Sequence, residues 1–223
     1  MRTLRPLPSR SHRRLPPLVR STVLISRVAL GAALVALGVL AGCRTAPPAA
    51  AVGPGADAPW PEQRAALEKL ERYGLNGRVA VAANGQGFSA SLRYQQMPGS
   101  SNLALDGPLG IGGLRVVLEG KELGIATSRG EKLDGDAARA ELELRLGFAL
   151  PLAELRWWLL GIPAPGDATL TQDTGTGEIR DFVQAGWRVS INSRAAGLGF
   201  SLPQRLTAER EGARLKLLVE RWQ

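Results

Sequence analysis

The chain has 223 residues, and its 28 lysines and arginines outnumber its 20 aspartates and glutamates, giving a formal charge of +8. Such a balance is typical of proteins that bind nucleic acids or acidic surfaces. Seven arginines and no acidic residue lie in residues 1–43, however, so 21 basic and 20 acidic residues follow Cys43. Because the rest of the chain is nearly neutral, we expect no nucleic-acid partner.

The only histidine, His12, and the only cysteine, Cys43, both lie in this N-terminal region. The chain after Cys43 therefore lacks the side chains for Ser-His-Asp or Cys-His catalysis, for a His- or Cys-based zinc site and for an internal disulfide. Asp173-Thr174-Gly175 matches the aspartic-protease triplet, but Thr174-Gly175-Thr176-Gly177 is more typical of a hairpin turn. We expect a protein that is not an enzyme and uses neither a metal nor a cofactor.

Residues 1–42 are predicted to be a lipoprotein signal peptide. A basic region precedes Val28–Gly42, an uncharged apolar stretch that would form a helix of roughly 22 Å, shorter than the ~30 Å hydrocarbon core of a bilayer. Leu40-Ala41-Gly42-Cys43 resembles the bacterial lipobox, which implies lipidation of Cys43 and cleavage before it. The alternative is a buried structural cysteine in an uncleaved anchor. Since Arg44 rather than aspartate follows, the resemblance implies sorting to the outer membrane.

The lipidated Cys43 and a flexible tether are predicted to occupy residues 43–59, which are rich in alanine, proline and glycine. Residues 60–223 are long enough for one domain with a sizeable core. This domain opens with a predicted helix over residues 61–74, which places Leu67, Leu70 and Tyr73 on one face and Gly74 at its C-terminal cap.

Apolar and polar residues then alternate, as expected for strands. Residues 75–83 and 88–95 read as a hairpin joined through an Asn-Gly turn. Further short strands are predicted at residues 102–106, 114–119, 122–127, 168–173, 178–184, 187–192, 205–210 and 213–222. Helices are predicted only at residues 136–146 and 151–160 within this series.

The predicted fold class is therefore α+β, with a curled antiparallel sheet whose apolar interior is covered by helices. Such an interior is either filled by its own side chains or open to a ligand. The candidates for contact with an apolar ligand belong to the apolar faces of these elements and are Val79, Val81, Leu92, Leu105, Leu118, Trp158 and Trp187.

A set of short motifs resembles the LolB family of outer-membrane lipoprotein receptors, and the resemblance spans the whole chain. The motifs are Gly77-Arg78-Val79-Ala80-Val81, Gly107-Pro108-Leu109-Gly110, Leu150-Pro151-Leu152, Leu155 to Pro163, Gln184 to Val189, Leu202 to Leu206, and Leu215-Lys216-Leu217 before Trp222. The chain departs from the family pattern at Tyr94, where tryptophan is common, and over residues 191–199, which lack the tyrosines often found there.

The resemblance implies a half-barrel of about eleven antiparallel strands with a helical lid over a hydrophobic cavity. It implies that the protein is anchored at the periplasmic face of the outer membrane, takes the acyl chains of cargo lipoproteins from a LolA-like periplasmic carrier, and inserts these lipoproteins into the membrane. We expect a monomer. The alternative is a generic lipid-binding or structural lipoprotein of the same fold.

Three features allow two interpretations each. By motif position Leu109, between Gly107-Pro108 and Gly110, is the exposed leucine that promotes membrane insertion, although it could instead tuck under the sheet edge. Adjacent Trp157 and Trp158 point about 100° apart on a helix, so that one could face the cavity and the other its rim, or both could be core. Arg78 is either solvated or a hydrogen-bonding contact that holds the lid closed.

Overall fold

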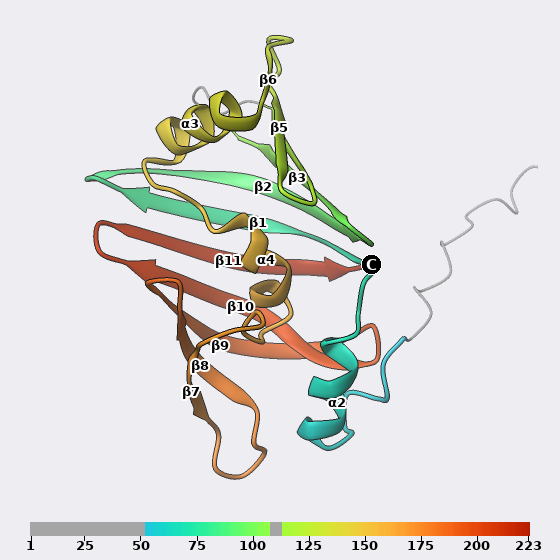
Figure 1. The fold of residues 1–223 in the computed structure, drawn as a ribbon. Helices are drawn as coiled ribbons and strands as arrows, with labels where there is room; N and C mark the ends of the chain where they lie inside the picture. The colour runs from blue at the N-terminus through green and yellow to red at the C-terminus, as the bar shows by residue number, and fades with distance from the viewer. Residues whose placement is uncertain (1–51, 108–112) are drawn as a thin grey trace, which may run out of the picture. The chain divides into compact units, whose positions relative to one another are not determined.

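The computed structural model describes residues 52–107 and 113–223 (Figure 1). Cys43, Pro108, Leu109 and Gly110 lie outside these residues, so the predictions made for them remain predictions. Within the described residues, no helix is long and apolar enough to cross a membrane.

Eleven antiparallel strands form one continuous, curled sheet with the order β6-β5-β4-β3-β2-β1-β11-β10-β9-β8-β7, so that β6 and β7 lie at its two edges (Figure 1). The strands are β1 (Tyr73–Ala83), β2 (Gln86–Met97), β3 (Ser100–Asp106), β4 (Leu114–Glu119), β5 (Glu122–Ala126), β6 (Lys132–Asp134), β7 (Thr169–Gln172), β8 (Ile179–Gln184), β9 (Trp187–Gly197), β10 (Phe200–Arg210) and β11 (Ala213–Trp222). The predicted α+β class and antiparallel half-barrel are confirmed.

Strict alternation of buried and exposed residues explains why the sheet has one apolar face. Along β2, Ala90, Leu92 and Tyr94 are buried while the residues between them are exposed. The paired registers place Leu92 beside Leu105 and Tyr94 beside Leu103, so rows of apolar side chains cross neighbouring strands on the concave face.

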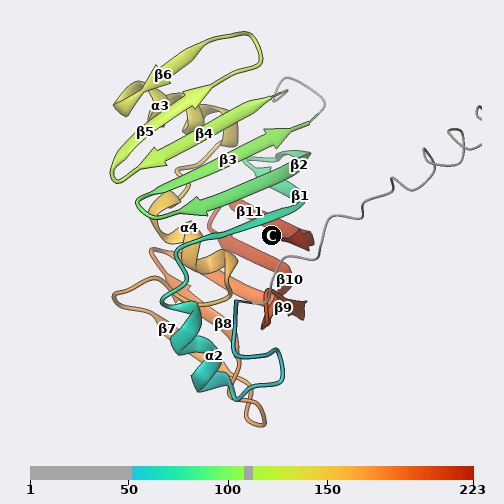
Figure 2. The ribbon, with the colours of Figure 1, turned by 90° about the vertical axis from the view of Figure 1, so that its right-hand side faces the viewer.

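Two helices, which follow β6 and precede β7 in the chain, cover this concave face (Figures 1 and 2). Helix α3 (Gly135–Leu146) buries Ala138, Leu142 and Leu146 and ends at Gly147, whose φ of 81° is the left-handed conformation of a helix cap. Helix α4 (Leu152–Leu159) is shorter and follows Pro151. Both helices match the predicted ranges within one residue.

The opening helix differs from its prediction, since α2 spans only Trp60–Leu67 and Tyr73 already belongs to β1. Tyr73 pairs with Gln96 of β2, and Gly74 exchanges backbone hydrogen bonds with Gln223 at 2.7 and 2.8 Å. Pairing of β1 with its neighbours therefore outweighs the local helical periodicity of residues 68–74.

Residues 52–59, here called the N-terminal strap, lie against the turn between β9 and β10, although the sequence predicts a flexible tether up to residue 59. The backbone N–H groups of Val52 and Gly53 both donate to Leu198 O, at 2.9 and 2.8 Å. A Cβ on Gly53 would lie 2.3 Å from the carbonyl oxygen of Gly199, so only glycine allows this close approach. The strap is thus built into the domain.

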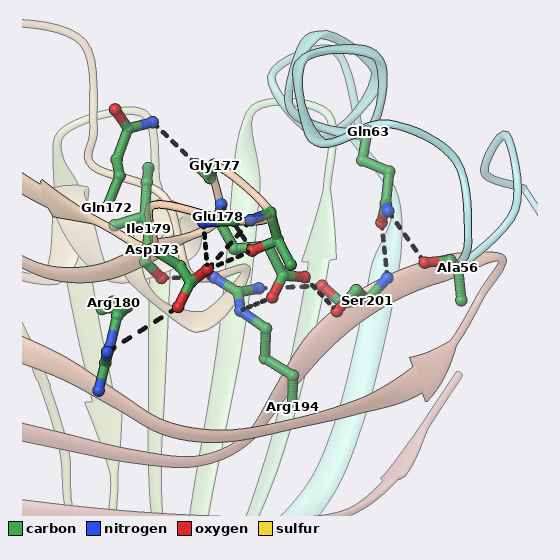
Figure 3. Close-up of polar contacts among 12 residues, drawn as sticks. Ala56, Gln63, Gln172, Asp173, Gly177, Glu178, Ile179, Arg180, Arg194 and Ser201 are labelled. Atoms are coloured by element: carbon green, nitrogen blue, oxygen red, sulfur yellow. Dashed lines mark hydrogen bonds and ion pairs between the residues drawn. The ribbon is translucent and has the colours of Figure 1, made fainter.

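A polar cluster joins the strap and α2 to the sheet (Figure 3). The Gln63 side-chain amide donates to Ala56 O and Ala58 O, and its oxygen accepts from Ser201 N at 2.7 Å. Beside it, the Ser201 hydroxyl donates to Glu178, and Arg194 donates to the carbonyl oxygens of Ser201 and Ile179. The residues of this cluster satisfy one another's hydrogen-bonding groups, which indicates a structural role in holding the strap and α2 against the sheet.

Candidate functional site

An apolar cavity lies between the concave face of the sheet and the two covering helices. Its lining has no polar surface. The lining residues are Val79, Val81, Leu92, Leu103, Leu105, Leu146, Leu150, Leu155, Trp158, Leu159, Leu206, Ala208, Leu215 and Leu217. The free space is about 70 Å³, whereas pockets for small-molecule ligands are typically about 300–1,000 Å³. A long apolar ligand can therefore enter only if the helices or lining side chains move.

The structure separates the seven residues predicted to face an apolar ligand into two groups. Five of them, Val79, Val81, Leu92, Leu105 and Trp158, line the cavity. Leu118 instead lines an adjoining depression near the turn between β2 and β3. Trp187 is fully buried behind the cavity wall, with its ring centroid 6.4 Å from that of Trp158 and 5.3 Å from that of Phe148.

The predicted set omits further lining residues. These come from β3, β10 and β11, from helices α3 and α4, and from the segment between the two helices. The alternation of apolar residues in β10 and β11 marks Leu206, Ala208, Leu215 and Leu217, which carry the same period-2 signal as the predicted set. Leu155 and Leu159 are spaced four residues apart on α4 and so face the cavity together.

Helix α4 is fixed to the sheet by hydrogen bonds rather than by packing alone. The indole N–H of Trp158 donates to the Gln184 side-chain oxygen at 2.9 Å. The same amide accepts from Ala164 N and donates to Ala164 O, both at 2.9 Å. Gln184 therefore holds the end of α4 and the segment that follows it, and Trp158 is a cavity-lining residue with a polar anchor.

Of the adjacent tryptophans, Trp158 is the buried one. Trp157 is partly buried against the core, and the Arg156 guanidinium lies 4.4 Å from its ring centroid. The structure thus places Trp158 in the cavity wall, whereas Trp157 packs against the core and does not line the cavity.

Two buried tyrosines lie at the end of α4 nearest the turn between β2 and β3. The Tyr73 hydroxyl donates to the carbonyl oxygen of Arg156, and the Tyr94 hydroxyl donates to Gln96 Oε1 at 2.7 Å. Burial raises the pKa of Tyr94 to about 12 and, together with the neighbouring Tyr94, raises the pKa of Tyr73 well above its usual value. Both hydroxyls are therefore neutral hydrogen-bonding groups at physiological pH.

Arg78 does not contact the helices, which contradicts the predicted lid contact. Its guanidinium pairs with Glu220 at 2.9 Å, and the side chain is 74% exposed. The reason is the pleat of β1, because Arg78 lies between Gly77 and Val79 and so points to the convex face when Val79 points inward.

A different residue links β1 to the covering helices. The Asn84 side-chain amide donates to Gly147 O at 3.1 Å, which connects the β1–β2 turn to the end of α3. Asn84 has a φ of 52° and is followed by Gly85 with a φ of 77°, as in the Asn-Gly turn predicted from the sequence. This contact joins residues 63 positions apart, which explains why local sequence patterns do not indicate it.

Of the predicted insertion loop only the first residue, Gly107, lies within the described residues, which resume at Gly113. Gly107 directly follows β3 and lies against β2, where a Cβ would come within 2.9 Å of Ser89 O. Gly113, with a φ of 70°, leads into β4. Both glycines lie at the end of the sheet that also holds the β1–β2 turn, since Asp106 pairs with Ser91 and Leu105 with Leu114.

Comparison with known proteins gives one family. The family model described as "Outer membrane lipoprotein LolB" matches residues 71–222. Proteins named outer-membrane lipoprotein LolB are similar over most of their length. The protein from Nitrosococcus oceani is 30% identical over 85% of this chain and 94% of its own. The one from Stutzerimonas stutzeri is 28% identical over 83% of this chain and 90% of its own.

Two solved structures are similar to this chain over part of its length. A LolA superfamily protein from Nitrosomonas europaea has a TM-score of 0.45 and 12% identity, with 69% of this chain and 86% of that chain covered. A DUF1329 family protein from Desulfovibrio piger has a TM-score of 0.47 and 9% identity, with 70% and 87% covered.

Proposed function

Because the chain belongs to the LolB family of outer-membrane lipoproteins, we propose that it is an outer-membrane receptor for lipoproteins. It accepts a lipoprotein from a periplasmic LolA-like carrier, holds the acyl chains of this cargo, and inserts it into the outer membrane. The observation that carries the proposal is the cavity under α3 and α4, whose lining is entirely apolar.

Acyl chains suit this cavity because they are apolar, as its lining is. Their transfer from one apolar environment to another requires no covalent chemistry. Each buried CH₂ group contributes about 0.8 kcal/mol relative to water, so a single chain of ordinary length supplies a large part of the binding free energy. Directional transfer then needs only an affinity that rises from the carrier to this receptor and from the receptor to the membrane. Binding displaces the covering helices or the lining side chains, since the free space in the structure is about 70 Å³.

The protein is proposed to reach the membrane through Cys43, after removal of residues 1–42. The strap is hydrogen-bonded to Leu198 and Gly199 from Val52 onward. The connection between the domain and the lipidated cysteine is therefore short and consists of residues 44–51. Three acyl chains on Cys43 would make attachment effectively permanent. The segment Gly107-Pro108-Leu109-Gly110 is proposed to promote insertion through the side chain of Leu109.

Depletion of the protein in its native host tests the proposal. Lipoproteins destined for the outer membrane are expected to accumulate in the periplasm with their carrier and in the inner membrane. Re-expression of the wild-type chain should restore their distribution. Normal sorting after depletion would instead fit the alternative of a generic lipid-binding lipoprotein.

A further inference from the structure

A second depression lies beside the apolar cavity, at the end of the sheet that holds the β2–β3 turn. About 190 Å³ of free space lies there between this turn and the start of α4, with polar residues Gln96, Ser100, Ser101 and Arg156 and apolar residues Leu118 and Leu152 in its wall. Unlike the cavity, this depression is partly polar.

The depression continues the cavity along both of its walls. On the sheet, Ser101 pairs with Gln96 and with Leu118, one inward-facing row beyond the row of Leu103, which lines the cavity. On α4, Leu152 lies one turn before the cavity residue Leu155. A ligand whose chains fill the cavity would therefore present its next atoms to this depression.

Arg156 supplies unused hydrogen-bond donors at this place. Of its five N–H donors, one bonds to Leu70 O at 3.4 Å, and Nε is buried without a partner. In the part of the chain that the structure describes, no carboxylate pairs with this guanidinium. The three remaining N–H groups belong to the terminal nitrogens and have no hydrogen-bond partner among the described residues, so they are free to donate to an oxygen atom bound in the depression.

We propose that this depression binds the ester carbonyl oxygens of the diacylglyceryl group whose acyl chains occupy the apolar cavity, with Arg156 as the principal donor. This inference rests on the proposed function. A diacylglyceryl group matches the two adjoining surfaces because it joins two apolar chains to ester oxygens that accept hydrogen bonds but donate none. Hydrogen bonds from a charged guanidinium to these oxygens are about twice as strong as neutral ones.

The same diacylglyceryl chemistry has two sources, the lipidated cysteine of a cargo lipoprotein and a membrane phospholipid. Binding should therefore be measured with a dipalmitoylglyceryl-cysteine peptide and with dipalmitoylphosphatidylglycerol. Each is compared with its dialkyl ether analogue, which keeps the chains and lacks the carbonyl oxygens. Displacement of a fluorescent fatty acid from the full chain gives the affinities.

The wild-type protein is expected to bind the ester peptide about tenfold more tightly than the ether peptide, as one charged hydrogen bond would provide. Arg156→Leu should remove this preference while leaving the affinity for the ether peptide unchanged, and Arg156→Lys should retain part of it. Arg78→Leu, which removes an exposed arginine on the convex face, is the matched control and should keep the full preference. A preference seen also with the phospholipid pair would extend the site to membrane lipids.

Two results would overturn the inference while leaving the receptor function intact. One is equal wild-type affinity for ester and ether forms, and the other is an Arg156→Leu variant that weakens both forms equally, which indicates a structural role. Circular dichroism of each variant identifies one that fails to fold, in which case Arg156→Lys decides the outcome. If the wild-type protein binds neither peptide, the proposed function itself fails.

Discussion

The indole Nε1 of Trp158 donates a 2.9 Å hydrogen bond to Oε1 of Gln184, which ties a cavity-lining residue of α4 to β8. Replacement of Gln184 by leucine would leave three buried polar groups without partners, namely Trp158 Nε1, Ala164 N and Ala164 O. Because each such group costs about 1–3 kcal/mol, we expect Gln184→Leu to lower the free energy of unfolding by roughly 3 kcal/mol.

Urea unfolding followed by tryptophan fluorescence measures this loss. Gln95→Leu, a substitution at an exposed position of β2, serves as the control and should change the free energy of unfolding by no more than about 0.5 kcal/mol. Equal stability of the two variants would show that Gln184 does not hold α4.

The contact between Asn84 and Gly147 predicts which residue restrains the segment between α3 and α4. Asn84→Gly removes the side-chain amide and suits the positive φ, so the turn itself should survive. Amide hydrogen exchange in residues 147–150 is expected to rise about fivefold, as loss of one hydrogen bond implies. Arg78→Leu should leave the same amides unchanged, because Arg78 pairs with Glu220 on the convex face. The reverse pattern would restore Arg78 as the lid contact.

The two tyrosines of the chain, Tyr73 and Tyr94, are both buried, which predicts a high-pH transition. In the unfolded chain each phenol ionises near pH 10, whereas in the folded protein the pKa of Tyr94 is about 12 and that of Tyr73 is also raised. Their contribution to stability is therefore complete below pH 10 and is lost as the pH rises toward 12. Absorbance at 295 nm should show almost no phenolate in the native protein at pH 10.5 and about three-quarters ionisation in urea. Substantial native ionisation at pH 10.5 would contradict this assignment.

Leu109 is expected to act after cargo binding. Leu109→Glu should leave acyl binding within twofold of wild type and reduce insertion of bound lipoprotein into liposomes at least tenfold, because burial of a leucine in lipid contributes about 1.5–3 kcal/mol that a carboxylate forfeits. Leu109→Ile keeps the apolar surface and should insert normally. If the glutamate variant binds and inserts as well as wild type, Leu109 has no role in insertion.

The sequence was sufficient to predict the alternating strands and the two covering helices, because each follows from a local period of apolar residues. It was insufficient where the pairing of distant segments determines the local structure. The helical period of residues 68–74 gives way to β1, since Tyr73 pairs with Gln96. β10 extends back to Phe200 despite Pro203, because a register shift after Pro203 accommodates the missing donor.

The same distinction applies to the site. Val79, Val81, Leu92 and Leu105 follow from alternation, and Trp158 from its place on a helix. The role of Gln184 depends on a partner 26 residues away, and that of Arg156 on contacts with Leu70 and Tyr73, more than 80 residues away. Hydrogen-bond partners this far apart in the sequence can be identified only when the order of the strands is known.

Reconstituted transfer tests the receptor function most directly. The full-length protein is placed in liposomes of outer-membrane lipids, and a purified complex of the LolA-like carrier with a fluorescent lipoprotein is added. We expect the lipoprotein to leave the carrier and float with the liposomes only when the protein is present, and to stay with the carrier when Leu155→Glu places a charge in the cavity lining. Lipoprotein that remains on the carrier in the presence of the folded wild-type protein would contradict the account.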